Sequence, residues 1–139
     1  MPDERLTTAW RDMAQDNCAT AGALYGIPGR HDVDREHLRS VVSRAYYAAY
    51  AMIHARLLES GVTPPSRGNF SHAKLPVVLY HSLEGDLGGA IAATLWHVVD
   101  TLYKLRLVAD YDPLAVVDDG DARMCLAHKS RVFKELKRC

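Results

Sequence analysis

The sequence predicts an all-α protein, an antiparallel up-and-down four-helix bundle with one additional short helix. Apolar residues recur at three- and four-residue spacing through four long segments, and no segment shows the sustained two-residue alternation of a half-buried strand. Glycine and proline cluster between these segments, and most connections are short, as between antiparallel helical neighbours. The 139 residues match the size of one domain, so we expect a single domain over residues 1–139.

The first helix is expected from about Arg5 to Tyr25. Leu6, Trp10 and Met13 begin an apolar stripe with helical spacing that continues to the end of this segment. The sequence GIPG at residues 26–29 ends the helix, because glycine and proline both interrupt helical structure.

The second helix is expected to begin near Asp32 or Asp34, either of which can cap it. It should end before Gly61, a suitable residue for a left-handed position after a helix. Two apolar seams predict that this helix is covered on two sides and is central in the bundle. The seams are Leu38, Val42, Ala45, Ala49 and Met52, and Tyr46, Tyr50, Ile53 and Leu57.

Residues 62–69 contain two prolines and a glycine, which predicts a loop. A short helix is expected over about residues 71–83, where Pro76 is tolerated only near the first turn. Asp86 is the predicted cap of the next long helix, which should extend from Leu87 to about Val108.

The long helix should end at Asp112, because a residue that precedes proline is pushed out of the α region. The last helix is expected to start at Asp118 or Asp119 and to end near the C-terminus. Lysine and arginine are frequent in its later turns, where positive charge suits the negative end of the helix dipole.

Composition limits the classes of function. The formal net charge is zero, so RNA binding requires a local basic patch rather than a globally basic protein. Cys18, Cys125 and Cys139 have no metal-ligand spacing, and we expect neither a metal nor a cofactor. The N-terminus lacks the apolar run of a signal peptide, and residues 90–99 are far short of the ~20 residues of a membrane span. We therefore expect a cytoplasmic protein.

The first candidate site is the sequence RLVADYDP at residues 106–113. Arg106 and Asp110 are four residues apart and share one helix face, with Tyr111 beside them where the helix ends. One interpretation is a local ion pair with a packed tyrosine. The functional interpretation is a phosphate-binding arginine next to a phenol, since the planar guanidinium donates two parallel hydrogen bonds to phosphate.

The second candidate is the sequence SRAYYAAY at residues 43–50. Tyr46 and Tyr50 lie on one helix face, and Tyr47 points about 100° away. The structural interpretation is an aromatic core with hydroxyls at its rim. The functional interpretation is that Arg44 and one tyrosine line the same groove as Arg106 and Tyr111.

His72 is the histidine of greatest interest, because it follows a Pro/Gly-rich loop and loops on rigid scaffolds concentrate functional residues. Capping or simple solvent exposure is the alternative. Arginine–histidine pairs also occur at Arg67 and His72 and at Arg123 and His128, but His128 is expected to be an ordinary surface or core-edge residue.

Together, the tyrosine block at 43–50, the segment around His72 and the Arg106–Tyr111 segment resemble the HEPN family (higher eukaryotes and prokaryotes nucleotide-binding). The resemblance covers about residues 33–138, which leaves residues 1–30 as an additional N-terminal helix. It implies an up-and-down helical bundle, a homodimer, and an RNA or nucleotide ligand. It also implies a toxin–antitoxin or defence system, often with a nucleotidyltransferase partner.

The toxin-type motif of active HEPN ribonucleases is arginine, four residues, histidine, one residue and tyrosine. This chain has Asp110 and Tyr111 in that segment and no histidine. An aspartate beside an arginine stays ionised and is a poor general acid, so cleavage would require His72 or His128 near Arg106. The resemblance thus favours binding over cleavage.

Three hypotheses follow. The first is a HEPN-type protein that binds RNA, a nucleotide or a partner through Arg44, Tyr46, Tyr47, Arg106, Asp110 and Tyr111. The second is a metal-independent ribonuclease toxin with Arg106 on the phosphate and His72 as acid–base, and the third is a structural interaction module without a ligand. The dimer face is expected on Trp10 and Met13, or on Leu95, Val99 and Leu102.

Overall fold

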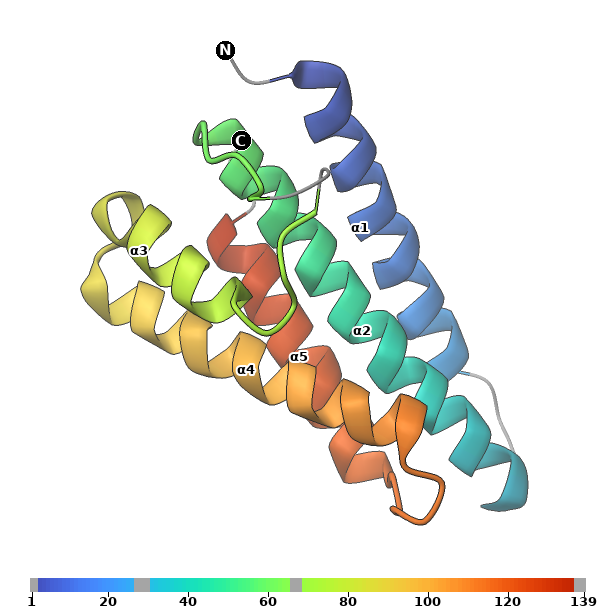
Figure 1. The fold of residues 1–139 in the computed structure, drawn as a ribbon. Helices are drawn as coiled ribbons and strands as arrows, with labels where there is room; N and C mark the ends of the chain where they lie inside the picture. Colours follow the sequence, from blue (N-terminus) through green and yellow to red (C-terminus); the bar gives the residue numbers. More distant parts are fainter. Residues whose placement is uncertain (1–2, 27–30, 66–68, 137–139) are drawn as a thin grey trace.

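The protein is all-helical (Figure 1). The computed structural model describes residues 3–26, 31–65 and 69–136, and only the backbone of residues 31–36. Its helices are α1 (Glu4–Tyr25), α2 (His31–Glu59), α3 (Leu75–Leu87), α4 (Gly89–Tyr111) and α5 (Asp119–Leu136). These described residues contain no β-strand, and the predicted all-α class is confirmed.

Helix α2 is the central element, as its two apolar seams predicted. It contacts α1, α3, α4 and α5. Figure 1 shows α1 along one side of α2, with α4 and α5 on the other side and α3 against α4. Both seams of α2 are buried in the core, from Val42, Ala45 and Ala49 to Tyr46, Ile53 and Leu57. Helices α1 and α2 run in opposite directions, and so do α4 and α5.

The ends of α1 and α2 follow local chemistry. Asp3 caps α1, because its Oδ1 accepts hydrogen bonds from the backbone N–H groups of Arg5 (3.0 Å) and Leu6 (3.2 Å). The C-terminal end of α2 matches the prediction, since Gly61, two residues beyond Glu59, has a φ of +84°. The backbone N–H of Val62 reaches back to the carbonyl of Leu57 (2.9 Å), which completes a Schellman-type ending.

Several predicted helix starts are wrong. Helix α2 begins at His31, so Asp32 and Asp34 lie inside it and do not cap it. Helix α3 begins at Leu75 instead of about residue 71, because Pro76 fits only in the first turn.

The junction between α3 and α4 also differs from the prediction. Asp86 does not cap α4, because it lies inside α3, where its Oδ2 is 2.9 Å from Nη2 of the buried Arg56. Gly88, with a φ of +87°, separates the two helices instead. A residue without a Cβ makes this sharp reversal possible without a longer loop.

The last two boundaries agree with the sequence. Helix α4 ends at Tyr111, a few residues beyond the expected Val108, and its C-cap Asp112 is extended (φ −112°, ψ 94°) as expected before a proline. Asp118 and Asp121 cap α5 reciprocally: Oδ1 of Asp118 accepts from the Asp121 N–H (2.8 Å), and Oδ2 of Asp121 accepts from the Asp118 N–H (3.1 Å).

One of the two predicted dimer faces is wrong, and the other, on Trp10 and Met13, stays a prediction. Leu95, Val99 and Leu102 are core residues with at most 1% exposure. The Trp10 ring stacks on His54 with centroids 3.8 Å apart, which leaves Met13, 49% exposed, as the accessible residue of the other seam. None of the described helices is long and apolar enough to cross a membrane.

Candidate functional site

Arg106 lies near the end of α4, where this helix passes α2, and it gathers several of the predicted site residues. Its side chain is buried, with 8% residue exposure. Nη2 donates hydrogen bonds to the hydroxyl of Tyr47 and, at 3.5 Å, to the hydroxyl of Tyr111. Nε lies 3.0 Å from Oδ2 of Asp110. Its N–H is not directed at an acceptor, so this contact is an ion pair by distance and not a hydrogen bond.

Aromatic rings surround the Arg106 guanidinium. Its Cζ lies 5.1 Å from the ring centroid of Tyr47, 5.3 Å from that of Tyr111 and 5.8 Å from that of Tyr46. Burial alone would lower the pKa of Arg106, but Tyr47, Tyr111 and Asp110 together raise it above its ordinary value. The Arg106 guanidinium is therefore always charged, and its Nη2 donates to the hydroxyl of Tyr47.

His72 joins this cluster through Tyr46. Its Nδ1 is 2.6 Å from the hydroxyl of Tyr46, a residue with no solvent exposure. The imidazole lies 4.3 Å from the ring of Tyr50, measured between centroids. Burial, and then the positive charge of Arg106, lower the pKa of His72, so the ring is neutral at pH 7. Burial likewise raises the pKa of Tyr46, which keeps its phenolic proton.

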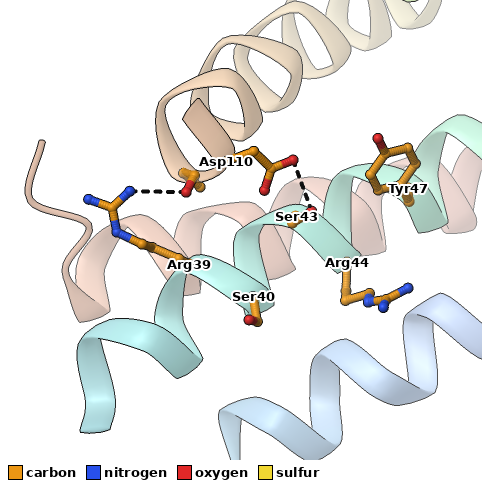
Figure 2. Close-up of a pocket in the computed structure, with 7 residues that line it drawn as sticks. Arg39, Ser40, Ser43, Arg44, Tyr47 and Asp110 are labelled. Atoms are coloured by element: carbon orange, nitrogen blue, oxygen red, sulfur yellow. Dashed lines mark hydrogen bonds between the residues drawn. The ribbon is translucent and has the colours of Figure 1, made fainter. Parts of the chain in front are cut away.

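A polar groove lies beside this cluster (Figure 2). Its volume is about 490 Å³, within the range of small-ligand pockets. One face of α2 forms most of the lining, because residues spaced by three and four lie above one another on a helix. The lining residues are Arg39, Ser40, Ser43, Arg44 and Tyr47 from α2, and Ala109 and Asp110 from α4.

Arg39 is engaged with the backbone at the end of α4. Its guanidinium donates to the carbonyls of Ala109 (3.0 Å) and Asp112 (2.9 Å), and also to those of Val108 and Ala115. Helix carbonyls in the last turn lack intrahelical partners and carry the negative end of the helix dipole. Arg39 thus satisfies these carbonyls and holds the loop that follows α4.

Arg44 differs from Arg39 in how few hydrogen bonds it makes within the part of the chain that the structure describes. Its exposed side chain donates from Nη1 to Oδ1 of Asn17 on α1, at 3.1 Å. Asn17 is itself oriented by a hydrogen bond from Nδ2 to the carbonyl of Met13 (2.9 Å). Figure 2 shows the Arg44 side chain directed toward α1, across the groove from Asp110. An amide orients this cation without neutralising it.

Asp110 forms the opposite wall of the groove. Its Oδ2 accepts a hydrogen bond from Ser43 Oγ at 3.3 Å and is the same atom that faces Arg106. The carboxylate side chain is 27% exposed. Asp110 therefore connects the buried Arg106 cluster to the groove.

The predicted residues are brought together, although not all in one place. Arg44, Tyr47 and Asp110 line the groove, whereas Arg106 lies behind them and Tyr46 is in the core. Tyr111, 68% exposed, contacts Arg106 without lining the groove.

The arginine–histidine pair on α5, Arg123 and His128, does not extend this site. Arg123 forms an ion pair with Asp119 one turn earlier on α5, at 2.7 Å. His128 is a half-buried residue of α5, and burial lowers its pKa. Arg67 lies outside the described residues.

Sequence reasoning missed Arg39, Ser40 and Asn17, and it included Ser43 in the segment SRAYYAAY without giving it a role. The helical spacing of Ser40, Ser43 and Arg44 was a usable signal, because it places two hydroxyls beside an arginine on one side of the helix. The role of Asn17 had no local signal, since it depends on how α1 packs against α2.

Comparison of the chain with protein-family models, with curated proteins and with solved structures gave no match.

Proposed function

We propose that this chain is a HEPN-type protein that binds a nucleotide or an RNA in the groove between α2 and the end of α4. The proposal includes an antiparallel up-and-down four-helix arrangement, a homodimer, and a place in a prokaryotic toxin–antitoxin or defence system. A nucleotidyltransferase is the expected partner protein, and the cytoplasm is the expected location.

One observation carries the proposal: Arg44 is an exposed, oriented cation whose partner, Asn17, is neutral. The hydroxyls of Ser40 and Ser43 line the same groove, and so does the half-buried ring of Tyr47. Guanidinium and hydroxyl groups are the donors that phosphate oxygens accept from. An aromatic ring at one end of the groove supplies a surface for a nucleobase.

The test is direct binding, measured by fluorescence anisotropy with a labelled single-stranded RNA and with labelled adenosine nucleotides. Arg44→Ala should weaken binding at least tenfold, since a hydrogen bond to a charged group contributes about 1.5–3 kcal/mol. Arg131→Ala is the matched control, because Arg131 is an exposed arginine of α5 whose ion pair is with Glu135. If wild type binds none of these ligands, a structural interaction module without a ligand is the better description.

A metal-independent ribonuclease is the second candidate, and the contact between His72 and Tyr46 favours it. This contact brings a neutral histidine into the aromatic cluster around Arg106. Because Nδ1 faces Tyr46, Nε2 is the atom of His72 that would move a proton.

Cleavage of a labelled RNA pool in EDTA tests this second candidate. Activity should be lost in His72→Ala and kept in His97→Ala, which removes an exposed histidine of α4. Equal cleavage by both variants would exclude His72 as the acid–base group.

A further inference from the structure

Among the residues that the structure describes, the groove offers a ligand one cation with a single side-chain hydrogen bond, Arg44. Among its lining arginines, Arg39 is hydrogen-bonded to the carbonyls at the end of α4, whereas Arg44, within the described residues, donates to the amide of Asn17 alone. Arg106 lies behind the groove, against Tyr47 and Asp110. A bound RNA strand is normally held by several cations along its backbone. One available arginine instead suits a ligand with a single phosphate group.

The wall opposite Arg44 is acidic, because it is formed by the carboxylate of Asp110. The Ser43 and Arg106 contacts of Asp110 both fall on Oδ2, so Oδ1 is the atom of this carboxylate best placed to accept from a ligand. A carboxylate repels phosphate and accepts hydrogen bonds from hydroxyl groups. Acidic side chains recognise ribose hydroxyls in this way in other nucleotide-binding folds.

The two walls are held in place independently. On one wall, Asn17 of α1 orients Arg44. On the other wall, Arg106 holds Asp110, and both of these residues belong to α4. Figure 2 shows Arg44 and Ser40 on the α1 side, Asp110 on the α4 side and Tyr47 at one end. Pre-oriented groups lose less conformational entropy when they bind a ligand, so this arrangement suits a ligand whose acceptors and donors occur in the matching order.

We propose that the ligand is a single ribonucleotide with its phosphate on Arg44 and Ser40 and its ribose hydroxyls on Asp110. Its base lies against Tyr47. This assignment rests on the proposed function, since it names the ligand class of the same groove. It predicts discrimination between ribose and deoxyribose, because only the 2′-hydroxyl gives Asp110 a vicinal pair of donors.

The experiment compares nucleoside 5′-monophosphates with their 2′-deoxy counterparts by isothermal titration calorimetry. Wild type should bind the ribonucleotides at least tenfold more tightly, as expected for a lost hydrogen bond to a charged acceptor. This ratio requires no variant, so a misfolded mutant cannot obscure it.

Variants then locate the discrimination. Asp110→Asn should reduce the ribose preference to less than threefold, and Arg44→Ala should weaken the binding of both the ribonucleotide and the deoxyribonucleotide at least tenfold. Asp100→Asn is the matched control and should behave as wild type. Like Asp110, Asp100 has a side chain with 27% exposure and an ion pair four residues along α4.

Failure of this inference is distinguishable from failure of the proposed function. Equal affinity for the two sugars, or a ribose preference that survives in Asp110→Asn, overturns the ribonucleotide assignment. If Arg44-dependent binding of a labelled RNA persists in that case, the groove is a phosphate site and the proposed function stands. Absence of binding by every nucleotide and RNA overturns both.

Discussion

Replacing Arg106 with methionine removes the centre of the aromatic cluster while keeping a side chain of similar length. The hydrogen bond to Tyr47 has a charged donor and is worth about 1.5–3 kcal/mol. The ion pair with Asp110 is partly exposed and adds about 0.3–0.5 kcal/mol. Three aromatic rings within 6 Å of Cζ contribute about 0.5–1 kcal/mol. We expect Arg106→Met to lower the free energy of unfolding by about 3 kcal/mol.

Urea unfolding followed by far-ultraviolet circular dichroism measures this loss. Lys104→Met is the control, because Lys104 is 71% exposed and pairs with Asp100 in the same four-residue geometry. The control should change the free energy of unfolding by less than about 0.5 kcal/mol. An Arg106→Met protein as stable as the control would refute the reasoning, since the tyrosines would then pack equally well without the cation.

Three further predictions concern His72, Arg39 and Gly88. The pKa of His72 is lowered in the folded state. Its contribution to the free energy of unfolding should therefore be fully present above about pH 6.5 and decrease as the pH falls below that value. His72→Gln should flatten that decline in urea midpoints, and an unchanged profile would contradict the assignment. Arg39→Met should lower the free energy of unfolding by about 2 kcal/mol and speed amide hydrogen exchange in residues 112–117. Unchanged exchange would show that the contacts of Arg39 with these carbonyls do not hold the loop. Gly88→Ala should lower the free energy of unfolding, measured by thermal unfolding, by about 1–3 kcal/mol, because Gly88 has a φ of +87°. Gly85→Ala, inside α3, should leave stability unchanged or raise it. Equal effects of the two substitutions would argue against backbone strain at Gly88.

The helices were predictable because their signals are local. Apolar spacing identified every long helix, and the double seam identified α2 as the central one. Helix starts were less predictable, because an aspartate near a helix boundary has other possible roles besides capping. Aspartate is a residue type that often caps helices, but Asp86 instead forms an ion pair with Arg56, which depends on the packing of α3 against α2. Such tertiary contacts outweigh local propensity, and one sequence cannot reveal them.

The candidate site divides along the same line. Arg106, Asp110 and Tyr111 are close in sequence, and helix geometry alone places them together. The contact from Arg106 to Tyr47 spans 59 residues, and the contact from Arg44 to Asn17 spans 27 residues. Both depend on how α2 packs against its neighbours, so spacing predicted which residues matter better than what each one does.

The three arginines at this site have different roles, and the difference decides how mutations must be interpreted. Arg39 donates to several backbone carbonyls at the end of α4, and Arg106 lies against the carboxylate of Asp110. Arg44 contacts a neutral amide and keeps its charge available to a ligand. Loss of binding in an Arg106 variant would therefore not identify Arg106 as a ligand contact, because the positions of Tyr47 and Asp110 depend on it. Arg44→Ala separates the two effects, since it should remove ligand binding while changing the free energy of unfolding by less than about 1 kcal/mol.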